Sequence, residues 1–281
     1  KQSLHTFRNV LKDKNFGELY GNGYEPKYKN AVFATVQTLS NLDFETYSTK
    51  NYFDYIILDE AHHGQASTYQ KIINYFDPQI LLGLTATPER MDGKSILPDF
   101  NNKIAAEIRL PDALNNKLLC PFQYFGISDS VDYSHIKWSS GKYDSAELTN
   151  IYTANDIRVG DIIKNLNDYT KDIHSVSAVG FCVSVEHAKF MQRKFCNAGL
   201  SAEYLVSENS ANREDIIHKF KKKEINYLFV VDIFNEGIDI PQIDTVLFLR
   251  PTESLTIFLQ QLGRGLRLSD DKDVLTVLDF V

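Results

Sequence analysis

Short apolar runs alternate with amphipathic segments along most of the chain, in two blocks. In the first block the apolar runs YIIL (55–58) and LLGL (81–84) flank a segment with apolar residues at helical spacing. In the second block the predicted strands and helices alternate strictly: 179–184, 186–197, 202–206, 213–222 and 227–231. Such alternation predicts parallel sheets. We therefore expect an α/β protein with two parallel-sheet domains, at 1–118 and 119–281.

Length and composition agree with two soluble domains, since 281 residues with 43% hydrophobic content can bury two cores. No apolar run approaches the roughly 20 residues that cross a bilayer, and no signal peptide is present, so we expect a cytoplasmic protein. Cys120, Cys182 and Cys196 have neither the number nor the spacing of a disulfide framework or a zinc site. Because the chain opens on Lys1 and stops at Val281 within a strand-like run, we interpret it as a piece of a longer protein with possible additional domains.

Polar clusters follow both apolar runs of the first block. Asp59 and Glu60 come directly after the first run, and Thr85 and Thr87 follow the second. Ligands of parallel sheets gather beyond the carboxyl ends of the strands, where one carboxylate can hold a metal ion while the other orients water. The pairing of DEAH with TAT favours such a site over a solvated strand end.

A helix predicted at 254–268 carries a second candidate site. Its apolar face is formed by Leu255, Phe258, Leu259, Leu262 and Leu266. Gln260, Gly263, Arg264 and Arg267 fall at i, i+3, i+4 and i+7 on another face. A glycine in a helix interior costs about 1 kcal/mol, so its presence favours a surface for close approach to anions over a solvated basic face.

Taken together, these segments resemble the DEAH/DExH branch of the superfamily 2 helicases, and most closely the bacterial helicases related to restriction-enzyme motor subunits. The matching segments are LDEAHH, GLTATPER, FCVSVEHA, VDIFNEGIDIP and QxxGRxxR, as motifs II to VI in the family's order. The resemblance implies two RecA-like domains, with ATP and Mg²⁺ in the cleft between them and nucleic acid across both. It also implies DNA rather than RNA, and a coupling role for Thr85 and Thr87.

The resemblance further implies a role for each charged residue of the two candidate sites. Asp59 would hold the Mg²⁺ that bridges the β- and γ-phosphates of ATP, and Glu60 would position the attacking water. Arg264 and Arg267 would reach the γ-phosphate from the second domain. Phosphoryl transfer needs this combination of charge neutralisation and an in-line nucleophile.

Coupling and nucleotide contacts are implied for four more residues. His62 and Gln260 would couple the two domains. Gly237 permits close backbone approach, and Asp239 would lie near the nucleotide or couple it to the nucleic-acid strand. One departure concerns motif V, where Val231 takes the place of a threonine that many relatives use for a nucleic-acid phosphate.

Nucleic-acid contacts are implied at two further segments. Thr35, Gln37 and Thr38 follow a predicted strand at 31–36 and match a segment that touches the nucleic-acid backbone. A Thr/Gln cap on the next turn explains these three residues equally well. Ser184, with a helix N-terminus behind it, would meet a backbone phosphate.

The chain contains no Walker A motif. The GKS at 93–95 resembles the end of one, but Pro88 stands where the first glycine is required. We expect the phosphate-binding loop to precede Lys1 and this piece alone to hydrolyse ATP weakly or not at all.

The net charge of −7 is unusual for a nucleic-acid-binding protein, although backbone amides and hydroxyls can hold phosphates without a basic surplus. The alternative function is a nucleic-acid-binding scaffold that has lost its ATPase activity. The intact acidic and arginine motifs argue against that alternative.

Overall fold

The chain forms two compact units in the computed structural model, Lys1–Glu107 (unit 1) and Ile108–Val281 (unit 2). The structure describes residues 1–63, 67–85, 95–139, 141–207, 212–231, 240–252 and 254–280. The division falls before α5 (Leu110–Asn115), whereas the sequence placed it after residue 118. Leu110 and Leu119 pack against the core of unit 2, so the connecting segment joins that unit.

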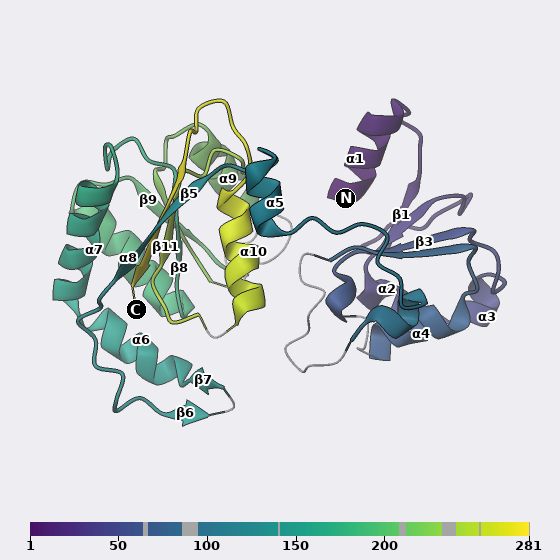
Figure 1. Ribbon diagram of the computed structural model, residues 1–281, viewed down its shortest axis with the longest axis horizontal. Helices are drawn as coiled ribbons and strands as arrows, with labels where there is room; N and C mark the ends of the chain where they lie inside the picture. Colours follow the sequence, from purple (N-terminus) through teal and green to yellow (C-terminus); the bar gives the residue numbers. More distant parts are fainter. Residues whose placement is uncertain are drawn as a thin grey trace. The chain divides into compact units, whose positions relative to one another are not determined.

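Among the described residues of unit 1, the strands form two separate parallel pairs. Figure 1 shows this unit with its helices. The first pair is β1 (Glu18–Tyr20) with β2 (Val32–Ala34), and the second is β3 (Tyr55–Leu58) with β4 (Ile80–Gly83). The helices and 3₁₀ turns of this unit are α1 (Gln2–Leu11), α2 (Val36–Ser40), α3 (Phe44–Tyr47), η1 (Ala61–His63), α4 (Ser67–Tyr75) and η2 (Leu97–Phe100).

Helix α4 and strand β3 share a small core that confirms the predicted helix between the two apolar runs. Ile72 and Phe76 are buried, and Ile56 of β3 packs against them. Because side chains alternate across a strand, Tyr55 and Ile57 point to the opposite face, where they are 67% and 48% exposed. The predicted apolar strand therefore exists, but it is buried on one face only within the described residues.

Unit 2 is built on one six-stranded parallel sheet, as the alternation of strands and helices predicted. The strand order is β5 (Phe122–Ile127), β12 (Leu275–Phe280), β11 (Thr245–Phe248), β8 (Ala178–Phe181), β10 (Tyr227–Val230) and β9 (Ala202–Leu205). All four residues of β8, β10 and β11 are buried. Central strands covered on both faces require such continuous apolar runs.

Helices cover both faces of this sheet (Figure 1). One core contains residues of α7 (Asp156–Tyr169) and α8 (Val185–Asn197), and the other contains residues of α9 (Arg213–Lys221) and α10 (Leu255–Gly265). Before α7 lies a segment with α6 (Ser145–Thr153) and a short hairpin of β6 (Trp138–Ser139) and β7 (Lys142–Tyr143). A buried ion pair joins the segment to α7, because Arg158 Nε donates to Asp129 Oδ2 over 2.7 Å.

Several predicted elements end earlier than expected, and the largest differences are in the strands predicted at 31–36 and 179–184, the latter ending at Phe181, and in the helix predicted at 254–268. The strand predicted at 31–36 ends at Ala34, because Val36 is already the first residue of α2. The helix predicted at 254–268 ends at Gly265, and Leu255 at its start is 73% exposed instead of lying on the core face. Across the described ranges, no helix combines the length and the apolar character that a membrane span needs.

The buried imidazole of His187 in α8 gives the stability of unit 2 a specific pH dependence. Its Nδ1 accepts the N–H of Val183, and its ring lies 4.9 Å from that of Tyr152. Burial lowers the pKa of His187 to about 3, and the Arg158 guanidinium acts in the same direction. Folding therefore holds this imidazole neutral.

We expect the free energy of unfolding to fall as the pH drops below about 6.5, the ordinary histidine pKa, because the unfolded chain then binds a proton that the folded chain excludes until about pH 3. The contribution is about 1.4 kcal/mol per pH unit in this window. Denaturant unfolding of the wild type and His187→Gln at pH 7, 6, 5 and 4 measures it, and the variant should lose stability less steeply. Equal slopes would contradict the assignment.

Candidate active site

The carboxyl ends of β3 and β4 lie side by side in unit 1. Their register pairs Leu58 with Gly83, and the backbone N–H of Leu84 donates to Leu58 O over 2.9 Å. The chain after β3 turns back to the same place, because the N–H of Ala61 donates to Leu84 O over 2.8 Å. The residues that follow both strands are thereby held at one edge, as the sequence predicted.

Asp59 and Glu60 occupy the turn that leaves β3. Asp59 is exposed, and its Oδ1 accepts the backbone N–H of Glu60 over 3.1 Å. Glu60 has a φ of 53°, in the left-handed region that residues with a Cβ adopt at a cost of about 1 kcal/mol or more. Strain of this kind at a carboxylate beside a strand end is typical of functional sites.

A histidine bridges the two strand ends. His62 Nδ1 lies 3.3 Å from Glu60 Oε2 and 3.1 Å from Thr85 Oγ1, and the histidine side chain is only 10% exposed. This contact was not anticipated from the sequence, which associated His62 with Gln260 of the second domain. The sequence did contain a signal for this contact: motifs II and III each follow a predicted strand, and adjacent parallel strands bring such ends together.

The donor set of this edge fits a magnesium ion that is held mainly by phosphate. Mg²⁺ is usually bound through one or two carboxylates plus substrate phosphates and water, and Asp59 is one exposed carboxylate at a strand end. Among the described residues no group of three His, Cys, Asp or Glu side chains could form a cage around a metal.

The second candidate site lies at the C-terminal end of α10. Gln260, Gly263 and Arg264 are in the helix, and all three are partly exposed. Arg267 is not in the helix, because α10 ends at Gly265 with Leu266 as its C-cap. The prediction of one helical face for all four residues was therefore wrong for Arg267, which extends from the segment that follows.

Two glycines near this helix end are in opposite environments. A methyl group added at Gly265 would lie 2.6 Å from Leu275 Cδ1, so the bare backbone allows the helix to pack on the sheet. A methyl group added at Gly263 would meet no atom within 4 Å among the described residues. Packing therefore explains Gly265 but not Gly263, for which close approach of a ligand stays a prediction.

Three of the residues predicted to contact nucleic acid, Thr35, Thr38 and Ser184, make local side-chain hydrogen bonds. Thr35 Oγ1 accepts the N–H of Thr38 over 3.2 Å and so caps α2, while the Gln37 side chain is exposed. Ser184 Oγ caps α8 by accepting the N–H of His187, and Thr149 Oγ1 donates to it over 2.9 Å. The capping alternative for Thr35 is thus supported, and the contacts to nucleic acid stay predictions.

Several predicted residues lie outside the described residues. They are Thr87 of motif III, the GK of the sequence at 93–95, and Gly237 and Asp239 of motif V.

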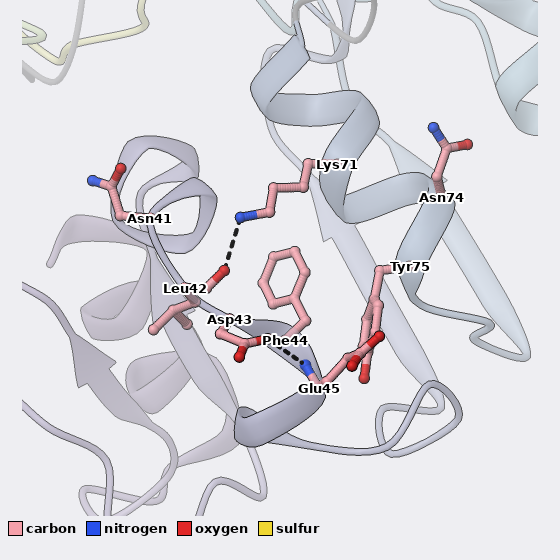
Figure 2. Close-up of a pocket in the computed structure, with 8 residues that line it drawn as sticks. All are labelled: Asn41, Leu42, Asp43, Phe44, Glu45, Lys71, Asn74 and Tyr75. Atoms are coloured by element: carbon pink, nitrogen blue, oxygen red, sulfur yellow. Dashed lines mark hydrogen bonds between the residues drawn. The ribbon is translucent and has the colours of Figure 1, made fainter.

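Figure 2 shows a hollow of about 650 Å³ in unit 1 that contains none of the predicted site residues. Lys71 crosses it, and its Nζ donates to the backbone oxygens of Ser40 and Leu42 over 2.7 and 2.8 Å. Asp43 Oδ1 accepts the N–H of Glu45 at the start of α3. These polar groups therefore hold α3 and α4 in place.

Comparison with known proteins identifies both halves of the chain. Residues 1–90 match the family model described as "Type III restriction enzyme, res subunit", and residues 161–269 match "Helicase conserved C-terminal domain". The chain belongs to the superfamily 2 helicases related to restriction-enzyme motor subunits. A similar curated protein of this helicase family is the putative ATP-dependent helicase IRC3 of Saccharomyces cerevisiae, 31% identical over 260 residues, which are 90% of this chain and 37% of IRC3.

Solved structures show that the helicase core has the expected RecA-like α/β fold. A fragment of a putative HsdR subunit of a type I restriction enzyme from Vibrio vulnificus matches 97% of the chain and 51% of its own length, with a TM-score of 0.77 and 21% identity. The ATP-dependent Type ISP restriction-modification enzyme LlaBIII bound to DNA matches 89% of the chain and 19% of its own length, with a TM-score of 0.62 and 19% identity. The chain spans less than half the length of IRC3.

The contrast between the two glycines of α10 gives a prediction that separates function from stability. Gly263→Ala should raise the free energy of unfolding by up to about 1 kcal/mol, because alanine favours the helix, and yet lower ATP turnover by the full-length helicase. Gly265→Ala should lower the free energy of unfolding by about 1 to 3 kcal/mol through overpacking against Leu275.

Gly160 is the matched control, since it lies within α7 and a methyl group there also meets no described atom within 4 Å. Gly160→Ala should stabilise the protein to a similar degree and leave ATP turnover unchanged. Denaturant unfolding and steady-state ATPase assays measure both quantities. Wild-type turnover in Gly263→Ala would remove Gly263 from the site.

Proposed function

We propose that the protein is an ATP-dependent helicase or translocase acting on DNA, with this chain as its motor core. The observation that carries the proposal is the contact of His62 with both Glu60 and Thr85. It joins the carboxylate that would handle water to the hydroxyl of the neighbouring motif. A change at the bound nucleotide can therefore be transmitted through His62 from the end of β3 to the end of β4.

Glu60 is proposed to orient the attacking water. Its carboxylate is 36% exposed, so water can reach it, and the left-handed backbone together with His62 limits its orientations. Asp59 would hold Mg²⁺ together with the phosphates. When bound, this ion neutralises the charge that develops on the phosphate oxygens.

Arg264 and Arg267 are proposed to contact the γ-phosphate of the same ATP molecule. Guanidinium groups suit this role because their donors match the geometry of phosphate oxygens. His62 and Gln260 are proposed to couple the two domains, together with Thr85 and Thr87. Gly237 and Asp239 remain proposed nucleotide contacts.

DNA is proposed as the polymer, in preference to RNA, because the similarity extends to restriction-enzyme motors, including a structure that is described as bound to DNA. Thr35, Gln37, Thr38 and Ser184 are proposed to contact its backbone. Additional domains and a cytoplasmic location are also part of the proposal.

The alternative is a nucleic-acid-binding scaffold without ATPase activity. The coding sequence upstream of Lys1 separates the two functions. A GxxxxGK[ST] loop there would support the motor, because the helicase needs backbone amides around the β- and γ-phosphates. A degenerate loop would support the scaffold.

Glu60→Gln in the full-length protein tests the proposed chemistry. The amide preserves the size of the side chain and removes its charge, so we expect ATP binding to be retained and kcat to fall by roughly two orders of magnitude or more. Nucleotide binding by fluorescence and turnover by phosphate release measure the two quantities.

Glu45→Gln is the control, because Glu45 is an exposed carboxylate in the same unit that no motif includes. It should bind and hydrolyse ATP as the wild type does. Unchanged turnover in Glu60→Gln would exclude Glu60 from the reaction, and loss of ATP binding would indicate a role in binding instead.

A further inference from the structure

A buried lysine lies beneath the candidate arginine site of unit 2. Lys272 is 8% exposed, and its Nζ donates to the backbone oxygens of Pro241, Ile243 and Gly265, each over 2.8 Å. An ammonium group has three N–H donors, and each has a carbonyl partner here. The lysine therefore satisfies its hydrogen-bonding capacity entirely with backbone.

These three carbonyls come from two separate parts of the chain. Pro241 is the last residue of the motif V segment, Ile243 lies two residues after it, and Gly265 is the last residue of α10. A positive charge at a helix C-terminus also favours the orphan carbonyls of the last turn. Lys272 thus holds the end of motif V and the end of α10 against each other.

The segment that carries Arg267 is held from a second direction. The N–H of Cys120 donates to Leu266 O over 2.7 Å, and Gly265 lies directly against Leu275. Because Arg267 follows the end of the helix, the hydrogen bonds of α10 do not set its backbone direction. That direction is set instead by the hydrogen bonds that Lys272 and Cys120 donate to the backbone oxygens of Gly265 and Leu266.

We propose that Lys272 is a positioning residue for ATP hydrolysis, which sets the direction in which Arg267 leaves the end of α10 by tying that end to Pro241 and Ile243. This inference rests on the proposed function. Burying a cation costs free energy, and an apolar side chain of similar length would fill the same space. The presence of a lysine here is therefore explained only if its three hydrogen bonds are needed. Desolvation lowers the pKa of Lys272, which shows that burial disfavours the charge.

The test compares kcat and KM for ATP in full-length Lys272→Met, Arg267→Ala and the double variant. Methionine keeps the apolar stem and removes the charge and all three donors. We expect kcat of Lys272→Met to fall by about 10- to 100-fold, the loss typical of a misplaced catalytic group, with KM for ATP nearly unchanged. Lys272→Arg should recover part of the loss because it keeps charged donors.

The double variant separates positioning from general destabilisation. If Lys272 acts through Arg267, adding Lys272→Met to Arg267→Ala should lower kcat no further, because residues that act as a unit are non-additive. A kcat of the double variant that is lowered by the product of the two single effects would overturn the inference.

Tyr227→Phe is the control, since it removes another buried hydrogen bond of unit 2, from Tyr227 Oη to Ile173 O over 2.6 Å. It should lower the melting temperature and leave kcat at the wild-type value. A fall of kcat in this control that matches its loss of stability would indicate a merely structural effect and overturn the inference.

Two further outcomes keep the inference and the proposed function apart. Wild-type kcat in Arg267→Ala would contradict the proposed role of the arginine itself. A low kcat in Arg267→Ala, with wild-type kcat in folded Lys272→Met, would overturn only the positioning inference. If Lys272→Met does not fold, Lys272→Arg decides: kcat below that of the wild type with unchanged KM supports the inference, and wild-type kcat overturns it.

Discussion

Parallel strand pairing is the constraint on which the candidate site of unit 1 depends, and the same pairing builds the sheet of unit 2. It brings successive strand ends to one edge of a sheet, so residues far apart in sequence can act together without contacts elsewhere. In unit 1 this places Glu60, His62 and Thr85 within hydrogen-bonding reach. In unit 2 the same rule places Cys182, which follows β8, and Val231, which follows β10, at one edge of the six-stranded sheet.

A second constraint governs what lies beyond the regular elements. Backbone direction in a helix is set by its own hydrogen bonds, but the chain that follows needs other partners. At the end of α10 these partners are Lys272 and the N–H of Cys120. Gly265 also packs closely on Leu275, so three contacts from outside the helix hold the chain just before Arg267.

Most strands and helices of unit 2 were predictable because central parallel strands have continuous apolar sequences. The helix face of motif VI was only partly predictable. Hydrophobic spacing placed Leu262 and Leu266 correctly, since both are buried, but it could not show that the helix ends before Arg267. That end is contacted by the side chain of Lys272 and by the backbone N–H of Cys120, and neither contact gives a periodic signal in the sequence.

The same limit applies in unit 1. The apolar run 55–58 predicted a strand. It did not predict which face is covered, because the residues of both faces are hydrophobic. In the structure Tyr55 and Ile57 lie on the exposed face. The motifs predicted the site residues by type, whereas the bridge through His62 required the register of two strands.

The central claim is that ATP turnover is coupled to DNA. The most direct measurement is the steady-state ATPase rate of the full-length protein as the DNA concentration is raised, with RNA of the same sequence in parallel. The account predicts that DNA increases kcat by about tenfold or more while RNA has little effect. A rate that is the same with and without DNA would contradict it.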